Sequence, residues 1–299
     1  MTGQSGHFGP SLTEPAPVAA HPPVQVDAAV VSARPLGAYV ELSLAAPEIA
    51  DRAEPGQFVA FAVGGPTSAM LLRRSIAIAG TAQGRVTVVV APHGPGSTWL
   101  AGLRAGDRVD VVGPLGRQFP LPAPGTPALL VGGGYGAAAL VGLAAALRAQ
   151  GSAVTSVAGA AGADRLCSLE ELAEHGEVVV TTDDGSAGRR GWVTDAAAEL
   201  VGAVGIVYAC GPMAMLRAVA DQASAAGVPS YVAVEEAMAC GIGVCMTCVL
   251  PVVGADGRTR FSRSCTEGPV FGGDRVRFAD VGRLTADLVG ADAMGVVLS

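Results

Sequence analysis

The chain has 299 residues, of which half are hydrophobic and 15% are charged, and its formal net charge is −7. This length and apolar content allow two or three domains with separate cores and exclude a disordered chain. The acidic balance argues against a nucleic-acid partner, because phosphate binding needs a concentrated basic surface. The sequence contains no lysine, which excludes Schiff-base chemistry and a Walker lysine.

Residues 1–23 are rich in Pro, Gly and Ala and lack the basic start and apolar stretch of a secretory signal. We therefore expect a disordered tail and a cytoplasmic protein, in which cysteines stay reduced and disulfides are disfavoured. Residues 128–147 carry no charge over a membrane-spanning length. Their glycine-rich interruption favours a buried strand, a tight turn and a buried helix over a membrane span.

Residues 24–122 contain short β-branched runs separated by Gly, Pro and Asp turns, which predicts a small antiparallel β-barrel. The expected strands cover residues 24–33, 38–46, 57–63, 75–80, 85–92 and 107–115. A proline-rich stretch at residues 120–127 is a plausible linker to the next domain.

Strand and helix patterns alternate over residues 123–230, which predicts a doubly wound α/β domain. The expected strands are residues 128–133, 153–160, 177–185 and 205–212, and the expected helices are residues 137–151, 168–176, 192–200 and 213–227. Four of the six cysteines lie in residues 231–275, which we expect to form a small third domain. Residues 276–299 would then be a C-terminal tail with a short helix.

Two strand–helix junctions are candidate nucleotide sites. Gly132–Gly136 reads "GGGYG", and glycines let the backbone turn sharply and approach a phosphate. The pattern differs from the G-x-G-x-x-G fingerprint, so an ordinary tight turn is an open alternative. Cys210–Met213, "CGPM", follows another strand at the edge where such sheets bind ligands. A lone cysteine such as Cys210 is also a common core residue.

The β-rich domain has two candidate anion-binding features. Gly96 and Ser97 precede an apolar helical run, where free N–H groups and a hydroxyl can bind an anion or simply cap a helix. Arg73 and Arg74 lie at the mouth of a strand, where arginine can hold a diphosphate or face solvent.

One further loop bears on the choice of dinucleotide. Asp164 and Arg165 follow an expected sheet strand. An acid there could bond a ribose hydroxyl, whereas an arginine could accept a 2′-phosphate, and both residues equally suit an exposed loop. The residues therefore leave the choice between NAD and NADP open.

The most specific local pattern is that of Cys240, Cys245, Cys248 and Cys265, spaced C-x4-C-x2-C with a distant fourth cysteine. This is the spacing of plant-type 2Fe–2S sites. Glycines between the first two cysteines permit a tight loop whose N–H groups can point at the sulfurs. Structural zinc sites usually contain two C-x2-C pairs, so iron–sulfur is favoured, with zinc and a metal-free site as alternatives.

The stretches "TTDDGSAGRRGWVTD", "YACGPMAML" and "EEAMACGIGVCMTCVLPV" with "CTEGPVF" resemble the electron transfer subunits of NAD-dependent dihydroorotate dehydrogenases. These belong to the ferredoxin–NADP reductase-like superfamily. The resemblance implies a flavin-binding barrel, an α/β nucleotide domain and a C-terminal cluster domain. It also implies FAD, a 2Fe–2S cluster and NAD as cofactors, and an FMN-containing dihydroorotate dehydrogenase catalytic subunit as the partner in a hetero-oligomer of pyrimidine biosynthesis.

The resemblance assigns flavin roles residue by residue. The family motif Arg-Pro-x-Ser keeps its arginine at Arg74, but its proline is Ser75 and its hydroxyl is lost at Ala77, so backbone groups would replace that hydroxyl. The family's Gly-Thr phosphate pair falls on Gly96 and Ser97. The residues implied to hold FAD are Arg74, Ser75, Ile76, Ala77, Val89, Val90, Ala91, Gly96 and Ser97.

The family's Gly-Gly-Gly-x-Gly-x-x-Pro motif falls on Gly132–Ala139, with alanine in place of proline. The residues implied to line the nicotinamide site are Gly133, Gly134, Cys210, Gly211, Pro212 and Met213, and the implied cluster ligands are Cys240, Cys245, Cys248 and Cys265. No side chain of this chain need act as acid or base, because hydride transfer at a flavin is cofactor chemistry.

Two other functions remain open. The first is a related reductase subunit that serves a hydrogenase, a sulfite reductase or a glutamate synthase, because the same cofactors suit all of these. The second is a zinc-stabilised interaction module, which would be colourless.

Overall fold

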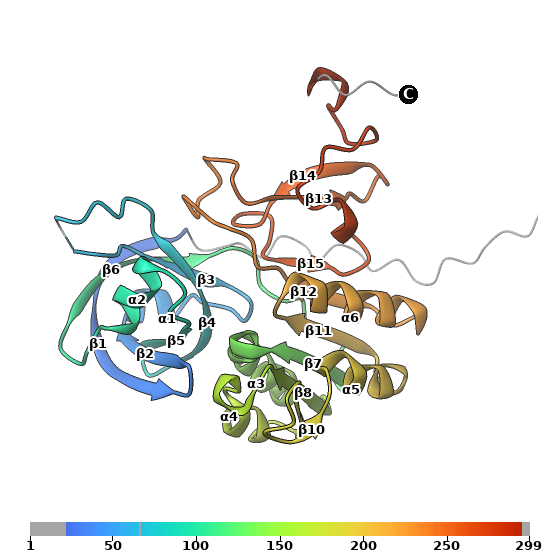
Figure 1. The fold of residues 1–299 in the computed structure, drawn as a ribbon, viewed down its shortest axis with the longest axis horizontal. Coiled ribbons are helices and arrows are strands. Elements are labelled where there is room, and N and C mark those ends of the chain that lie inside the picture. Colours follow the sequence, from blue (N-terminus) through green and yellow to red (C-terminus); the bar gives the residue numbers. More distant parts are fainter. Residues whose placement is uncertain (1–21, 66, 295–299) are drawn as a thin grey trace, which may run out of the picture.

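The computed structural model describes residues 22–65 and 67–294 of the chain. In Figure 1 a barrel and a helix-covered sheet lie side by side, and a smaller unit extends from the junction between them. The expected tail, residues 1–23, lies outside the described residues except for its last two.

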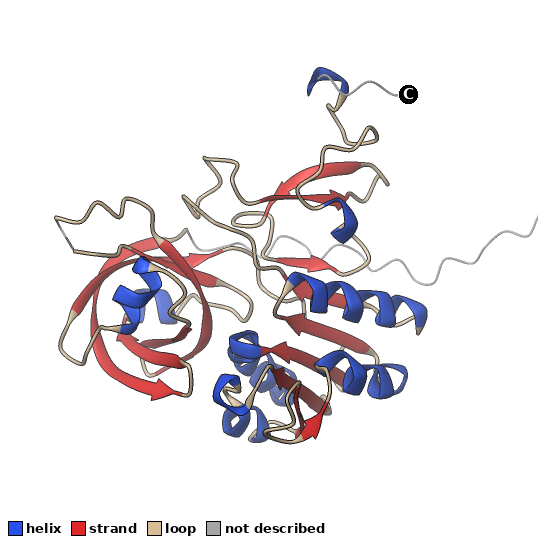
Figure 2. Cartoon of the chain, in the orientation of Figure 1, coloured by secondary structure: helices blue, strands red, loops and turns tan. Residues whose placement is uncertain are grey.

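Six strands close into an antiparallel barrel in the order β1-β2-β5-β4-β3-β6 (Figure 2), which confirms the predicted barrel. In β5, Val86, Val88 and Val90 are buried in the barrel core, because alternate residues of a strand face the same side. Ile49 and Leu100 bring the two short helices α1 and α2 onto the same core. The bounds are β1 Val24–Leu36, β2 Tyr39–Ala45, α1 Pro47–Ala50, β3 Phe58–Phe61, β4 Arg74–Ala82, β5 Arg85–Val90, α2 Pro95–Ala101 and β6 Arg108–Leu115.

The second body is a seven-stranded sheet in the order β10-β9-β8-β7-β11-β12-β15. All its strand pairs are parallel except β12 with β15. The sequence of β7 is apolar throughout because both faces of the strand are buried. Its neighbouring residues Leu129 and Leu130 are both fully buried, but they belong to the cores on opposite faces of the sheet. The strand bounds are β7 Ala128–Gly133, β8 Val154–Ala160, β9 Glu177–Thr182, β10 Arg189–Arg190, β11 Ile206–Cys210, β12 Ser230–Ala233 and β15 Val270–Gly272.

Helices cover both faces of this sheet, which confirms the doubly wound architecture. Leu143 of α3 and Leu172 of α4 pack on one face, and Ala196 of α5 and Leu216 of α6 pack on the other. The bounds are α3 Val141–Ala149, α4 Leu169–Ala173, α5 Val193–Leu200 and α6 Met213–Ala225. Within the described ranges, no helix combines the length and the apolar character needed to cross a bilayer.

The helix predicted over residues 137–151 differs in its first turns. Residues Gly134–Leu140 form a 3₁₀ helix, η1, and α3 begins only at Val141. The start of η1 is pressed against two strands: a methyl group at Gly136 would lie 2.7 Å from the carbonyl carbon of Cys210, and one at Gly132 would lie 2.6 Å from Cα of Ala137. Small residues permit this approach and bring η1 to the edge of the sheet.

The third unit is built around a hairpin of β13 Val249–Val253 and β14 Thr259–Arg263. Residues 231–275, expected as a separate domain, also contribute β12 and β15 to the large sheet. Residues beyond 275 pack along the hairpin, because Val276 bridges to Val252 and Leu288 bridges to Thr259. The predicted C-terminal helix is a single 3₁₀ turn at Asp292–Met294, and residues 295–299 lie outside the described part.

Tyr208 connects the sheet to the barrel linker. Its ring is fully buried, meets Phe119 edge-on at 5.5 Å between centroids, and its hydroxyl donates a 2.6 Å hydrogen bond to the Pro120 carbonyl. The ring of Tyr231 stacks on it at 6.0 Å. The linker is therefore fixed to the sheet by one specific polar contact inside an aromatic cluster.

Replacing Tyr208 by phenylalanine should lower the free energy of unfolding by about 1–2 kcal/mol, because the Pro120 carbonyl loses its donor in a partly buried site. Urea unfolding of the holoprotein measures the change. Tyr231→Phe is the matched control, because it removes a hydroxyl from the ring that stacks on Tyr208 and leaves the Tyr208–Pro120 bond in place. Equal losses in the two variants would contradict a role for the Tyr208–Pro120 bond.

Candidate functional site

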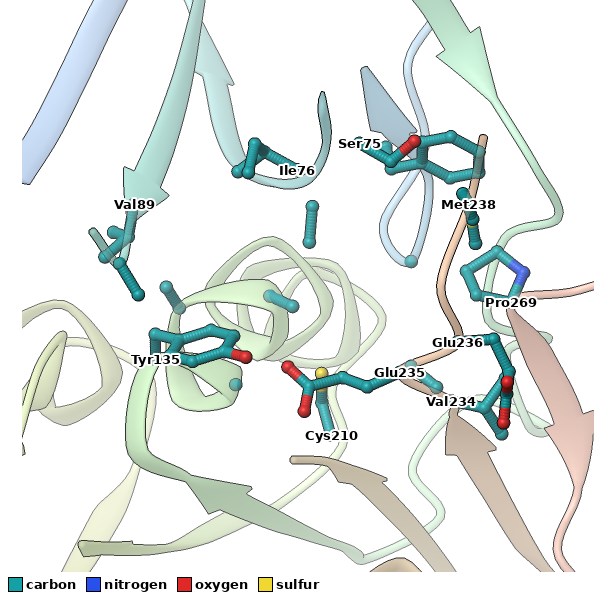
Figure 3. A pocket seen from close by; sticks show the side chains of 18 of the residues that line it. Ser75, Ile76, Val89, Tyr135, Cys210, Val234, Glu235, Glu236, Met238 and Pro269 are labelled. Atoms are coloured by element: carbon teal, nitrogen blue, oxygen red, sulfur yellow. The ribbon is translucent and has the colours of Figure 1, made fainter. Parts of the chain in front are cut away.

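A cavity of about 370 Å³ lies between the barrel and the carboxyl edge of the sheet (Figure 3). β4 and β5 supply the barrel side, whereas η1 and the end of β11 supply the sheet side. The segment that follows β12, residues 234–238, closes a third side. Ligands of open α/β sheets bind at this edge of the strands, so the cavity is the candidate cofactor site.

Most of the residues implied to hold flavin lie at this cavity. Those that line it are Ser75, Ile76, Ala77, Val89, Ala91 and Ser97. Val90 points the other way, into the barrel core, because successive side chains of β5 alternate between the two faces. A contact of Val90 with a ligand in the cavity would therefore come from its backbone.

Arg74 and Gly96 lie together just beyond the lining residues. A methyl group at Gly96 would lie 2.7 Å from Cζ of Arg74, so the glycine leaves room for the guanidinium. Arg74 donates hydrogen bonds to the carbonyls of Leu72 and Arg73, at 2.6 and 3.3 Å, and to no carboxylate of the described chain. Its charge is available to an anion at the end of the cavity.

Arg73, although adjacent, is already paired. Its guanidinium lies 2.5 Å from Oδ1 of Asp110 and donates to the Ala60 carbonyl at 3.2 Å. Burial raises the pKa of Asp110, but hydrogen bonds from Arg73 and Gln25 outweigh burial and hold that pKa below its usual value. Arg73 therefore stabilises the barrel, and of these two arginines only Arg74 suits an anionic ligand.

The hydroxyl of Ser97 fixes the turn before α2. It accepts hydrogen bonds from the backbone N–H groups of His93 and Gly94, at 2.9 and 3.1 Å, and donates to the Gly94 carbonyl at 3.2 Å. With these three bonds the side chain shapes the loop. Contacts from this turn to a ligand would come mainly from its backbone.

Of the residues implied to line the nicotinamide site, only Cys210 reaches the cavity. Gly133, Gly211 and Pro212 pack on one another: a methyl group at Gly133 would lie 2.9 Å from Cδ of Pro212 and 3.6 Å from Cα of Gly211. Gly134 lies beside the hydroxyl of Tyr39. Met213 starts α6 and packs into the core on the opposite face of the sheet. These glycines hold the strand ends close together below the cavity.

Sequence reasoning missed Tyr135 and Glu235, which point toward each other beside Cys210 in Figure 3. The Tyr135 hydroxyl faces the Glu235 carboxylate, and burial together with this acid raises the pKa of Tyr135. Burial, with Glu235 nearby, also raises the pKa of Cys210 to about 12, so its thiol stays protonated. A tyrosine inside the glycine motif and an acid directly after a parallel strand were the available signals.

The four cysteines of the C-terminal unit lie together as two pairs. Cys240 contacts Cys245 near the surface, and Cys248 contacts Cys265 in the interior. Burial raises the pKa of Cys265 to about 12, whereas hydrogen bonds from Thr247 lower the pKa of Cys245 to about 6. In the described ranges, no three His, Cys, Asp or Glu side chains surround one point closely enough for a single metal ion.

The loop that carries the first three cysteines has the backbone of a sulfur-binding loop. Gly241 and Gly243 have φ values of +71° and +81°, which glycine adopts freely. The Val244 N–H donates to Sγ of Cys240 at 3.4 Å. A 2Fe–2S cluster takes four cysteine thiolates, so two thiol pairs and backbone donors fit this group.

The cavity and the cysteine loop share a wall of the barrel. Phe58 and Met238 line the cavity and also belong to the apolar cluster around Cys248 and Cys265. On the same wall, a methyl group at Gly241 would lie 3.7 Å from Oγ of Ser75. One layer of side chains therefore separates the cavity from the cysteines.

Residues 235–277 match a family model described as the iron-sulfur cluster binding domain of dihydroorotate dehydrogenase B. Over 235 residues the chain is 41% identical to the dihydroorotate dehydrogenase B (NAD(+)) electron transfer subunit of Bacillus caldolyticus, which covers 77% of this chain and 90% of that relative. The subunit of the same name from Listeria monocytogenes is 39% identical over 228 residues, covering 75% and 87%.

The chain belongs to the family of dihydroorotate dehydrogenase B electron transfer subunits. Solved structures agree with its fold. A NADH-dependent reduced ferredoxin–NADP oxidoreductase, solved in a study of flavin-based electron bifurcation, has a TM-score of 0.75 at 31% identity and covers 85% of this chain and 91% of its own. The Amycolatopsis cytochrome P450 reductase GcoB has a TM-score of 0.58 at 33% identity, covering 69% and 67%.

For this electron transfer subunit we expect Cys248→Ser and Cys265→Ser each to abolish nearly all iron binding, because both thiols are buried and no water can replace them easily. Iron content and visible absorbance of anaerobically purified protein measure the loss. Cys167→Ser and Cys210→Ser are matched controls, because both residues are buried outside the loop and should leave the iron content unchanged. Stoichiometric zinc in the parent protein would contradict the iron–sulfur site.

Proposed function

We propose that this chain carries electrons from an FMN-containing dihydroorotate dehydrogenase catalytic subunit, through a 2Fe–2S cluster and FAD, to NAD+ in pyrimidine biosynthesis. The shared wall carries the proposal, because Phe58 and Met238 contact both the cavity and the buried cysteines. FAD, when bound, supplies single-electron exchange with the cluster and hydride exchange with NAD+. The names of the relatives, which include NAD(+) and a subunit role, support the same assignment.

Different residues at the cavity would contact different parts of FAD. Arg74 and the backbone of the Gly96–Ser97 turn would hold the diphosphate, since a guanidinium and free N–H groups both favour phosphate oxygens. Ile76 and Val89 would pack against the ring, because they present apolar surface to the cavity. The chain thus supplies position and electrostatics, and the four cysteines supply the cluster.

The edge of the sheet supports NAD over NADP. At the ends of β8 and β9, Asp164 and Asp184 face the same glycine: a methyl group at Gly162 would lie 3.1 Å from Oδ1 of Asp164 and 2.9 Å from Oδ2 of Asp184. Carboxylates at this position suit the hydroxyls of a ribose and repel a 2′-phosphate. The structure therefore offers an acidic environment where the adenosine half of a dinucleotide would lie.

A second candidate function is that of a related reductase subunit with a different partner enzyme. It is favoured by the 31% identity over most of the chain to the ferredoxin–NADP oxidoreductase structure. Both functions use the same cavity and the same cysteine loop, so the partner and the dinucleotide distinguish them.

The test is reconstitution with a candidate FMN-containing catalytic subunit. We expect the two chains to co-purify and to couple dihydroorotate oxidation to NAD+ reduction, whereas this chain alone should only oxidise NADH with an artificial acceptor. Activity with NADP+ should be much lower than with NAD+. A co-purified complex with full iron and FAD but no coupling would overturn the first function in favour of the second.

Arg74→Gln should weaken FAD binding by about 10- to 100-fold, because hydrogen bonds to charged groups are worth ~1.5–3 kcal/mol. Equilibrium titration of deflavinated protein with FAD measures the change. Arg73→Gln is the matched control, since that arginine is paired with Asp110 and should affect unfolding but not FAD affinity. Equal FAD affinities of the parent and Arg74→Gln would remove Arg74 from the flavin site.

A further inference from the structure

Thr266, the residue after the last cluster cysteine, has a hydroxyl that the described chain does not satisfy. Its Oγ1 is buried and lacks any hydrogen-bond partner among the described residues. The hydroxyl of Ser264, on the other side of Cys265, is likewise unpartnered and its side chain is fully buried. A buried hydroxyl without a partner is destabilising, so these positions call for an acceptor.

The side chain of Thr266 lies inside the cysteine loop. A methyl group at Gly243 would lie 2.8 Å from Cγ2 and 3.3 Å from Oγ1 of Thr266, and Gly243 stands midway between Cys240 and Cys245. Thr266 directly follows Cys265 in the sequence. Thr266 Oγ1 and Gly243 therefore belong to the same small region of the cysteine loop.

This region is held rigidly by Arg263. Its guanidinium donates to the Gly243 carbonyl at 3.1 Å, and Oε2 of Glu267 accepts from both the backbone N–H and Nε of Arg263, at 2.9 and 3.1 Å. The Gly243 carbonyl thus already accepts one hydrogen bond. Thr266 directly follows Cys265 in the sequence and lies against Gly243, so cysteine sulfurs are candidate acceptors for its hydroxyl.

We propose that Thr266 donates a hydrogen bond to the sulfur shell of the 2Fe–2S cluster and so raises its reduction potential. The inference rests on the proposed function, because it needs a cluster at the four cysteines. A donor fixed beside the sulfurs would stabilise the reduced form of a bound 2Fe–2S cluster more than the oxidised form, because the reduced form carries more negative charge on its sulfurs. Thr266 would thus adjust the electron transfer step between the partner's flavin and the FAD of this chain.

The experiment compares Thr266→Val, which keeps the shape and removes the hydroxyl, with Thr266→Ser, which keeps the hydroxyl. The one-electron potential of the holoprotein cluster is titrated by electron paramagnetic resonance. We expect Thr266→Val to lower the equilibrium constant for reduction about tenfold, which is 59 mV for a one-electron couple, and Thr266→Ser to match the parent. Where Thr266→Val assembles no cluster, Thr266→Ala answers the same question without crowding the loop.

Thr181→Val is the matched control, because the Thr181 hydroxyl in β9 is equally buried and unpartnered within the described chain but lies outside the cysteine loop. Its variant should leave the potential unchanged. An unchanged potential in Thr266→Val, or an equal shift in Thr266→Ser, would overturn the inference while leaving the proposed function intact. Absence of iron, or of dihydroorotate coupling, would instead count against the proposed function.

Discussion

The packing of Cys248 and Cys265 against the barrel is the contact on which the rest of the arrangement depends. Phe58, Ala60 and Leu115 form the wall they press on, and all five side chains are almost fully buried. The removal of apolar surface from water favours this contact but does not require one geometry. The identity of the buried residues matters for function, because the two thiols place sulfur atoms at the barrel surface. An electron carrier bound to the loop then lies next to one bound in the cavity.

One excursion of the chain makes this contact possible. The chain leaves the sheet after β12, passes the cavity at Glu235 and Met238, builds the cysteine loop and the hairpin, and returns to the same edge as β15. The return is tied to the segment that follows β6, where the Arg117 N–H donates to the Gly268 carbonyl at 2.6 Å. Both ends of the excursion are therefore anchored, so the position of the loop follows from the sheet and not from a flexible tether.

Periodicity and spacing were enough to predict the barrel, the doubly wound sheet and the four cysteines. Each is a local pattern: short β-branched runs, strand–helix alternation, and a C-x4-C-x2-C loop. The direction in which an individual side chain points could not be predicted from such a short stretch of sequence. Val89 faces the cavity and Val90 the barrel core, and the difference depends on the register of β5 against β2 and β4.

The acid–tyrosine pair shows the same limit more clearly. Tyr135 and Glu235 are a hundred residues apart and meet only because β7, β11 and β12 are neighbours in the sheet. The glycine contacts among Gly133, Gly211 and Pro212 also depend on that strand order. A sequence motif can identify residues of a site when all of them lie in one turn of the chain. Side chains from separate strands are brought together only by tertiary packing, which a local motif does not contain.

The residues of β4 at which this chain departs from the family's flavin motif differ in their position relative to the cysteine loop. Ala77 lacks the hydroxyl found in the family, whereas Ser75 carries one two residues earlier, on the same face of the strand. Ala77 pairs with Phe58, but Ser75 pairs with Ala60 and approaches Gly241 of the cysteine loop. The Ser75 hydroxyl thus lies about 7 Å along the strand from the position of Ala77, toward the cluster end of the wall, given the rise of a strand. In this chain the Ser75 hydroxyl therefore lies where the cavity meets the cysteine loop, while the stretch of β4 at Ala77 is apolar.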